Sequence, residues 1–306
     1  MNLRLSAPGA AILCVSALAS TGLAAQIPEP LFPIWEDRKL GLINADGAVV
    51  VPPSLGLPRA GRIGYNLSTP FPLHCFTAFL IPVSDGRSWG FMDRTGKLAI
   101  DLKFDEAEAF SEGLAAVRVQ ERWGFIDSAG RAIIPPTFQQ ATGFHEGVAA
   151  VSSPERRAWG YVDPQGNWVI PAGFEEAHPF YQGLAAVATE RRQKGRRMGA
   201  RMGYINHEGT FVVPPRFTDA GDLQEGMAAV APQSGDTYRY GYIDSTGNGA
   251  IRPQFDTARE FSDGLAPVTL GSRHGYIDRS GQFVITLEAG MAPYPFSEGL
   301  GLVNVE

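Results

Sequence analysis

The stretch that decides the fold runs from Trp123 to Val151 and reads WGFIDSAGRAIIPPTFQQATGFHEGVAAV. Two close copies flank it: WGFMDRTGKLAIDLKFDEAEAFSEGLAAV from Trp89 and WGYVDPQGNWVIPAGFEEAHPFYQGLAAV from Trp159. The glycine in second place recurs at Gly41, Gly90, Gly124, Gly160, Gly203, Gly241 and Gly275. Seven units therefore fill the chain beyond its N-terminal segment, and the spacing of 34 to 49 residues between these glycines is typical of a repeat architecture.

Each unit begins with a strand, a turn and a second strand. Residues 123–127 alternate with a period of two and are rich in aromatic and β-branched types, which predicts a strand. The Asp-x-x-Gly sequence at 127–130 recurs with Asp or Asn in every unit and predicts the hairpin turn, because the carboxylate or amide bonds the nearby backbone. Residues 132–134 then predict a second strand, which Pro135 ends.

The rest of the unit is a connector and a third strand. The connector carries two phenylalanines about six residues apart, such as Phe138 and Phe144, and ends at Glu146-Gly147. A strand reading LAAV or close to it follows, as at residues 148–151. Eight such strands, counting residues 31–34 and 80–83, accompany seven hairpins.

These two signatures together, W-G-[FY]-[IV]-D-x-x-G and F-x-E-G-L-A-x-V, resemble the bacterial WG-repeat (KWG-type) family over residues 31–303. The Trp itself is present in three of the seven units. The resemblance implies a secreted or surface repeat protein that acts as an interaction scaffold. It attaches no catalytic residue to the motif.

The unit length and strand count indicate an all-β fold of seven β-meander units. Three strands and a connector suit a blade of a propeller, so we favour a seven-bladed β-propeller. An open stacked β-array is the alternative, because the extra LAAV-like strand would serve either to close a ring or to cap an open end.

Residues 1–25 have the pattern of a secretory signal peptide: Arg4 near the start, a short apolar stretch, and small residues ending at Ala25. We therefore predict residues 26–306 as the exported WG-repeat β domain, in the periplasm or secreted, with no membrane span after cleavage. Cys14 is removed with the signal peptide, so Cys75 has no partner for an intramolecular disulfide. The net charge of -6 argues against nucleic acid as a partner.

Several motifs of known chemistry are better explained by the repeat. Gly86-Arg87-Ser88-Trp89-Gly90 matches the G-x-S-x-G motif of hydrolases, but a hairpin follows it where that motif requires a helix. The five histidines follow repeat spacing and have no metal-ligand pattern, and the Asp-x-x-Gly turns lack the ligands of a calcium loop. We therefore expect no catalytic residues, no metal and no cofactor.

The Glu-Gly positions place one acidic residue in most units at equivalent points, as at Glu112 and Glu146. In a closed ring they would form an acidic rim that binds a cation or an amine. The interpretation we favour is that each Glu caps the turn before the LAAV strand.

Two insertions interrupt the repeat, and insertions in repeat proteins often carry binding. The first, residues 54–79, is rich in Pro, Gly and aromatic residues and suggests a binding loop or a lid. The second has six basic residues and no acidic one, and predicts a site for anionic partners: Arg191, Arg192, Lys194, Arg196, Arg197 and Arg201. We call residues 191–201 the basic loop.

The sequence thus favours an exported, non-enzymatic β-repeat scaffold that binds a protein or an anionic envelope polymer. The alternative is a propeller enzyme that acts on glycans through carboxylates in a central mouth. Its test in a structure is a pair of inward carboxylates. Neither the ligand nor the oligomeric state follows from the sequence.

Overall fold

The computed structural model describes residues 32–36, 39–43, 48–56, 80–193, 196–232, 238–288, 291–297 and 300–305. The predicted signal peptide, both cysteines and residues 57–79 of the first insertion lie outside the described residues. Throughout the described ranges every helix or strand is a β-strand, which confirms the all-β prediction. These ranges contain no helix long and apolar enough to cross a membrane.

The strands fall into four kinds. The LAAV-like strands are β1 (Phe32–Glu36), β4 (Leu80–Ser84), β8 (Leu114–Val119), β12 (Val148–Ser153), β16 (Ala185–Gln193), β19 (Met227–Pro232), β23 (Ala266–Leu270) and β27 (Leu300–Val305). The WG strands are β2 (Lys39–Ile43), β5 (Trp89–Asp93), β9 (Arg122–Asp127), β13 (Ala158–Val162), β17 (Arg196–Ile205), β20 (Tyr240–Asp244) and β24 (Arg273–Ile277).

The strand after the Asp-x-x-Gly turn is the outer strand of each unit, and β3 and β18 also pair with the next LAAV strand. These outer strands are β3 (Val49–Gly56), β6 (Leu98–Phe104), β10 (Ala132–Phe138), β14 (Trp168–Phe174), β18 (Phe211–Ala220), β21 (Gly249–Phe255) and β25 (Phe283–Thr286). The fourth kind of strand lies in the connector and ends before the Glu-Gly turn or its equivalent. These strands are β7 (Glu106–Ala107), β11 (Gln140–His145), β15 (Glu176–Ala177), β22 (Thr257–Ala258) and β26 (Met291–Ser297).

Antiparallel pairing joins an LAAV strand, the following WG strand and the outer strand into a meander, and the described residues contain seven of them. The strand order β7-β8-β9-β10 and its equivalents add the fourth strand at the inner edge. A sheet therefore takes its LAAV strand from one sequence unit and its WG strand from the next. We number the seven meanders, each with the inner segment just before it, as blades 1 to 7 in chain order. Blade 3 is β7 to β10, blade 4 is β11 to β14, blade 5 is β15 to β18, blade 6 is β19 to β21 and blade 7 is β22 to β25.

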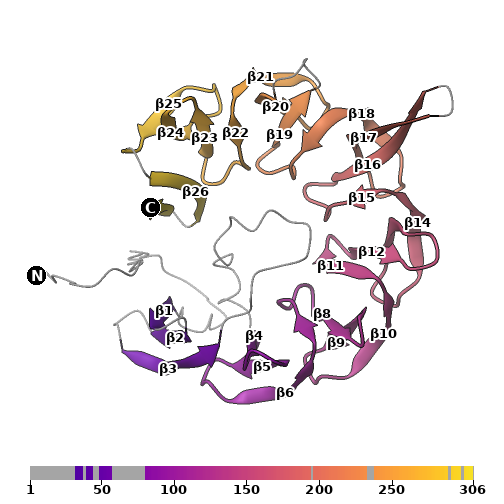
Figure 1. The fold of residues 1–306 in the computed structure, drawn as a ribbon, viewed down its shortest axis with the longest axis vertical. Helices are drawn as coiled ribbons and strands as arrows, with labels where there is room; N and C mark the ends of the chain where they lie inside the picture. Colours follow the sequence, from indigo (N-terminus) through magenta and orange to yellow (C-terminus); the bar gives the residue numbers. More distant parts are fainter. Residues whose placement is uncertain are drawn as a thin grey trace, which may run out of the picture.

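The blades are arranged around a common centre, which confirms the propeller prediction (Figure 1). The strands β11 and β15 lie on the side of their blades that faces this centre, and the outer strands β6, β10 and β14 lie at the periphery. At the C-terminal end, β26 pairs with β27 and contacts blade 7. Among the described strands, no sheet contains strands from both ends of the chain.

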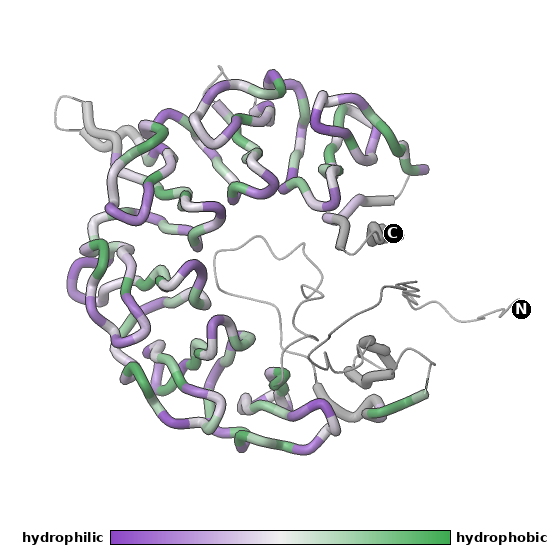
Figure 2. The backbone as a smooth tube through the Cα atoms, turned by 180° about the vertical axis from the view of Figure 1, so that it is seen from behind, coloured by the Kyte–Doolittle hydropathy of each residue, from purple (hydrophilic) through white to green (hydrophobic). Residues whose placement is uncertain are grey.

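The hydrophobic core lies between successive blades. One cluster joins Phe125 and Ile134 of blade 3 to Phe144, Ala149 and Val162 of blade 4. Both faces of an LAAV strand are buried, as the pattern BBBB at residues 114–117 shows, because each blade packs against a neighbour on either side. Small alanines in these strands allow the sheets to approach closely. Hydrophobic segments recur in blade after blade in Figure 2.

The Asp-x-x-Gly turns cap their own backbone, as predicted. Asp127 accepts hydrogen bonds at Oδ1 from the backbone N–H of Ala129 at 3.0 Å and of Arg131 at 2.9 Å. Gly130 has a φ of 76°, a conformation that glycine adopts at little cost. The side-chain hydrogen bond from Arg131 and these backbone donors lower the pKa of Asp127. The carboxylate therefore serves the turn.

Candidate functional site at the centre of the propeller

The innermost segment of each blade presents residues that differ from unit to unit. In blades 4 and 5 the segment runs from a buried alanine to a buried ring, from Ala141 to Phe144 and from Ala177 to Phe180. The ring packs into the blade: the centroid of Phe180 lies 4.9 Å from that of Tyr161. The two residues between alanine and ring are therefore the ones left to line the centre, since the strand's other contacts are fixed by the fold.

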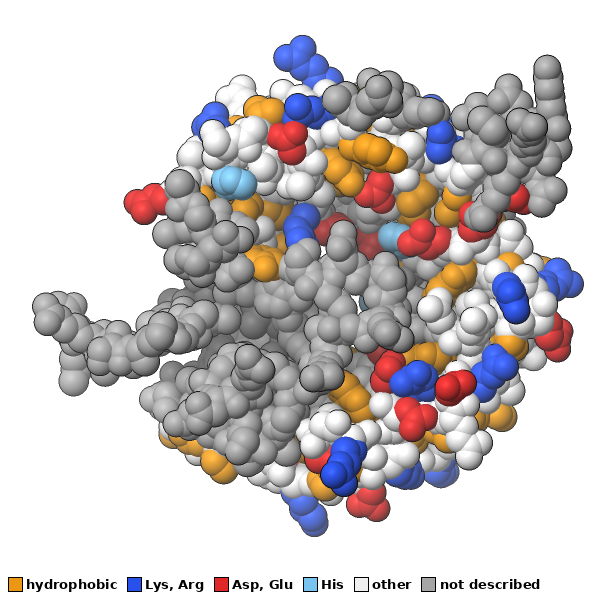
Figure 3. Space-filling view, viewed as in Figure 1, with side chains coloured by type: hydrophobic (Ala, Val, Ile, Leu, Met, Phe, Trp, Pro, Cys, Tyr) orange, Lys and Arg blue, Asp and Glu red, His pale blue; other side chains and the backbone are white. Residues whose placement is uncertain are grey.

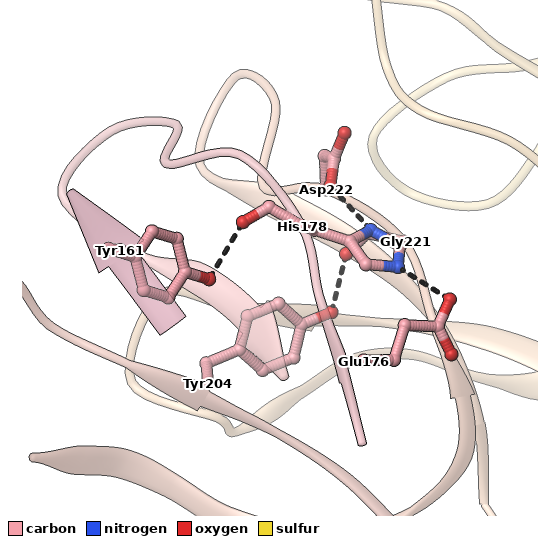
Figure 4. Close-up of polar contacts among 6 residues, drawn as sticks. All are labelled: Tyr161, Glu176, His178, Tyr204, Gly221 and Asp222. Carbon is pink, nitrogen blue, oxygen red and sulfur yellow. Dashed lines mark hydrogen bonds and ion pairs between the residues drawn. The ribbon is translucent and has the colours of Figure 1, made fainter. Parts of the chain in front are cut away.

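His178 occupies this position in blade 5 and binds two carboxylates (Figure 4). Its Nδ1 atom lies 2.9 Å from Oδ1 of Asp222 in blade 6, and its Nε2 atom lies 3.5 Å from Oε1 of Glu176. Burial alone would lower the pKa of His178, but the hydrogen bonds to Asp222 and Glu176 raise it to about 10. His178 is therefore a cation that links two blades at the centre.

Buried tyrosines hold these innermost segments in place. The hydroxyl of Tyr161 donates a hydrogen bond of 2.8 Å to the backbone carbonyl of His178, and Tyr204 makes the same bond to Gly221 (Figure 4). Tyr242 repeats it to Arg259. Each tyrosine belongs to the WG strand of the preceding blade, so the position of one blade's inner segment is set by its neighbour.

The pKa values of two carboxyl groups near the centre are raised by their surroundings. Burial raises the pKa of Glu108 to about 7, and the charge of Glu106 contributes. In blade 7, burial and the charge of Asp222 raise the pKa of Glu260. Asp222, by contrast, faces the charged His178. The centre therefore combines an ion pair with carboxyl groups that are protonated more easily than usual.

The Glu-Gly turns bind one another across the blades. The carboxylate of Glu112 accepts a hydrogen bond from the backbone N–H of Gly147 in the next blade at 2.9 Å, and Glu146 accepts one from Gly183 at 2.9 Å. The series continues with Gln182 to Gly226 and Glu225 to Gly264. We call these four contacts the turn latches.

The latches correct one interpretation made from the sequence. The Glu residues do cap turns, but each caps the turn of the following blade. Both central residues of each turn have positive φ, such as 52° at Glu146 and 82° at Gly147, as in a two-residue type I′ hairpin. This turn points its glycine N–H away from the hairpin, so that the neighbouring carboxylate can bind it. The carboxylates that would have formed the alternative, an acidic rim, thus accept hydrogen bonds from backbone donors.

We predict that Glu146→Ala lowers the free energy of unfolding by about 1–2 kcal/mol, because it removes a charge-assisted acceptor of the Gly183 N–H. Oε2 of Glu146 also lies 3.1 Å from Nε2 of His207, and the substitution by Ala removes that contact as well. Glu146→Gln should cost less, since Gln182 fills the same role in the next latch. Urea denaturation of the two variants tests this, and an equal loss for both would contradict a role as acceptor.

The basic loop forms the tip of a long hairpin. Arg191 and Arg192 belong to β16, whereas Arg196, Arg197 and Arg201 belong to β17. The register pairs Arg192 with Arg197, and the hairpin projects from the periphery of blade 5 (Figure 1). The structure thus gathers five of the six predicted residues on one hairpin, while Lys194 lies outside the described residues.

The other candidates occupy structural positions. Ser88 precedes β5, which leads through a hairpin turn into β6, so the requirements of a nucleophile elbow are not met. His207 stacks on Phe180 with centroids 4.0 Å apart. Among the described residues, no group of three or more His, Cys, Asp or Glu is arranged to hold a metal ion.

The sequence analysis missed the residues that line the centre, namely Glu108, His178, Asp222, Arg259 and Glu260. One signal was present: the residue that follows the recurring alanine differs in every copy, as Glu108, Thr142, His178, Gly221 and Arg259 illustrate. Side chains that the repeat motif does not set can make contacts particular to one unit, as His178 does with Asp222.

The WG containing repeat family matches the chain at residues 89–122, 123–153, 159–190, 202–231, 240–273 and 275–306. The chain therefore belongs to this family. The predicted unit that begins at Leu40, the first along the chain, is outside the matched ranges. Its strands β2 and β3 nevertheless pair as in the other units. No curated protein matches the chain.

Similar solved structures include propellers of low sequence identity. The β-propeller domain of the Trilobed protease from Pyrococcus furiosus is 9% identical, with a TM-score of 0.45 over 81% of this chain and 89% of that one. Apo AztD from Citrobacter koseri is 14% identical, with a TM-score of 0.42 over 85% and 80%. Hsv2 from Kluyvelomyces marxianus is 11% identical, with a TM-score of 0.43 over 69% and 75%. The propeller fold follows from the strand pairing and the arrangement of the blades.

Proposed function

We propose that this WG-repeat propeller is an exported, non-enzymatic scaffold that binds an anionic envelope polymer or an acidic protein through the basic loop. The observation that carries the proposal is the hairpin of β16 and β17, which projects from blade 5 with basic residues on both strands. The remainder of the chain has an excess of acidic residues. The hairpin is therefore a localised positive region on a negative protein, and it attracts anions selectively.

The register of the hairpin supports the same proposal. Arg192 pairs directly with Arg197. Like charges placed opposite each other on paired strands destabilise the hairpin, and an anion bound between the strands would offset that cost. The proposal does not depend on the identity of the polymer, because phosphate and carboxylate groups both satisfy guanidinium groups.

We predict that replacing Arg191, Arg192, Arg196 and Arg197 by Ser abolishes binding to a polyanion while the melting temperature stays unchanged. Binding of wild type and variant to heparin, to polyphosphate and to an envelope extract should be compared at low and high salt. Exposed charges are screened beyond about 8 Å at physiological ionic strength, so salt should weaken the wild-type interaction strongly.

The matched control spreads the same change in charge over four exposed arginines outside the loop: Arg87, Arg122, Arg131 and Arg252. If this control variant loses polyanion binding as completely as the loop variant does, binding follows net charge and the loop is no site. If the loop variant recovers the same anionic partners as wild type, the binding surface lies elsewhere.

An enzyme that acts on glycans is a second candidate, and one observation favours it. Asp222 and Glu260 come from adjacent blades and influence each other electrostatically, with Asp222 facing His178 and the pKa of Glu260 raised by burial and by Asp222. One of these carboxyl groups faces a histidine and the other is desolvated, and a pair of carboxyl groups in unlike surroundings is what an acid and base mechanism uses. Release of reducing ends from an envelope glycan, abolished by Glu260→Gln, would establish this activity.

A further inference from the structure

The innermost segments of five blades are strongly acidic. Residues 105–113, 139–147, 175–183, 218–226 and 256–264 together carry thirteen Asp or Glu, one Arg and no Lys, in a chain with 32 acidic and 26 basic residues. Figure 3 shows acidic side chains beside a histidine at the inner edge of the ring. Charges of one sign along a low-dielectric wall reinforce one another and raise the local concentration of counter-ions.

Three residues from successive blades come together there. Tyr181 lies in blade 5 between His178, which contacts Asp222 of blade 6, and Gln182, which accepts a hydrogen bond from Gly226 of blade 6. The negative charges of Asp222 and of Glu260 in blade 7 add to the effect of burial and raise the pKa of Tyr181. Oε1 of Glu260 reaches Gly221, where a Cβ atom would lie only 3.4 Å from it. Tyr181, Asp222 and Glu260 therefore share one region of the inner surface, which we call the central mouth.

The cationic side chains near the central mouth already contact carboxylates or an aromatic ring. His178 lies between Asp222 and Glu176, and the guanidinium group of Arg259 lies 5.5 Å from the centre of the Tyr294 ring. The side chain of Glu260 is bonded by its own backbone N–H and is near the charges of Arg259 and His178, yet burial outweighs these effects and raises its pKa. A half-buried carboxylate of this kind is poorly compensated unless a donor from outside the chain binds it.

Aromatic rings border the same region. The rings of His145 and Tyr181 lie side by side, with centroids 4.8 Å apart. Burial lowers the pKa of His145 in spite of the carboxylates nearby, which favours the uncharged imidazole. The ring pair therefore offers a π surface without positive charge, next to the carboxylates, and organic ammonium groups bind such surfaces.

We propose that the central mouth, formed by Tyr181, Asp222 and Glu260, binds a small organic cation through an amine group. Glu260 accepts the ammonium hydrogen bonds, Asp222 adds charge, and the rings of Tyr181 and His145 contact the carbon chain. A metal ion fits less well, because the described residues provide no group of three ligands for one. The site is separate from the basic loop and does not depend on the function proposed for that loop.

Isothermal titration of the full chain with putrescine, spermidine and 1,4-butanediol tests the proposal. Butanediol has the carbon chain of putrescine without its charges. We expect saturable binding of the two amines and none of the diol. Glu260→Gln should weaken amine binding about tenfold, the effect of one charge-assisted hydrogen bond. Glu155→Gln, at an exposed position in a turn, is the matched control and should leave amine binding unchanged.

Thermal melting of each variant shows that the fold is intact. Equal affinity of wild type and Glu260→Gln for putrescine would overturn the proposal, as would equal binding of putrescine and butanediol or the lack of any amine binding. The four-fold Arg→Ser variant of the basic loop should bind amines as wild type does. If it loses both polyanion and amine binding, the central mouth is not an independent site.

Discussion

Gly124→Val is expected to lower the free energy of unfolding by about 3 kcal/mol or more, whereas Ser128→Val should change it by less than about 0.5 kcal/mol. Gly124 lies in β9 where the outer strand β10 crosses it closely. A Cβ atom there would lie 2.5 Å from the backbone oxygen of Ile134 and 2.7 Å from the nitrogen of Pro136. These are backbone atoms, so no side-chain rotation relieves the clash.

The cause is a bulge in the outer strand. The register between β10 and β9 shifts between Ile134 and Phe138, where two prolines interrupt the ladder. β10 continues through both prolines to Phe138, so the prediction that Pro135 ends this strand was wrong. Ser128, by contrast, is exposed in the hairpin turn. Urea denaturation of both variants measures the difference. Equal midpoints would show that the glycine of the WG pair has no steric role in the repeat.

The same repeated positions explain how much of the fold follows from the sequence. The glycine, the Asp-x-x-Gly turn and the alternating strand each have a local physical requirement, so their recurrence reveals the three-strand meander. Gly124 and Asp127 illustrate this, since one must lack a side chain and the other must bond its own turn. Seven meanders and a propeller arrangement were predicted on these grounds.

The innermost strand was not predicted, because its stability is not local. The pair Glu106 and Ala107 forms a strand by bonding to Arg118 and Val117 of the same blade, and the segment after it is held by a neighbour. No propensity of two residues reveals such a strand. The sequence of the connector therefore predicted no strand there, although the connector forms the inner surface of the propeller.

The residues of the central mouth could not be predicted from the sequence for a related reason. His178 and Asp222 are 44 residues apart, and a repeat of variable length does not say which residues of adjacent units face each other. The turn latches illustrate the same limit: Glu112 and Gly147 are both visible in the motif, but only the packing of adjacent blades brings them together. The basic loop was easier to find, because its residues are close in sequence. Its partner stays a prediction.

The second large effect concerns His178. His178→Gln should lower the free energy of unfolding at pH 7 by about 3 kcal/mol, because it leaves Asp222 and Glu176 without their shared cation near Glu260. The side chain of His178 is 15% exposed, so water compensates this loss poorly. Glu176→Gln should cost much less, since the Glu176 side chain is 52% exposed and Asp222 still holds the histidine.

The pH dependence separates an ion pair from simple packing. The pKa of His178 is about 10 in the folded chain and 6.5 without its partners, since Asp222 and Glu176 stabilise the charged ring and outweigh the effect of burial. The folded state therefore holds the proton more tightly, and the stabilisation is complete below pH 6.5 and disappears as the pH rises through 10. The difference in unfolding free energy between wild type and His178→Gln should accordingly shrink from pH 6.5 to pH 10, as measured by urea denaturation at both values. A difference that stays constant over this range would mean that His178 acts as a neutral packing residue and that its charge does not link blades 5 and 6.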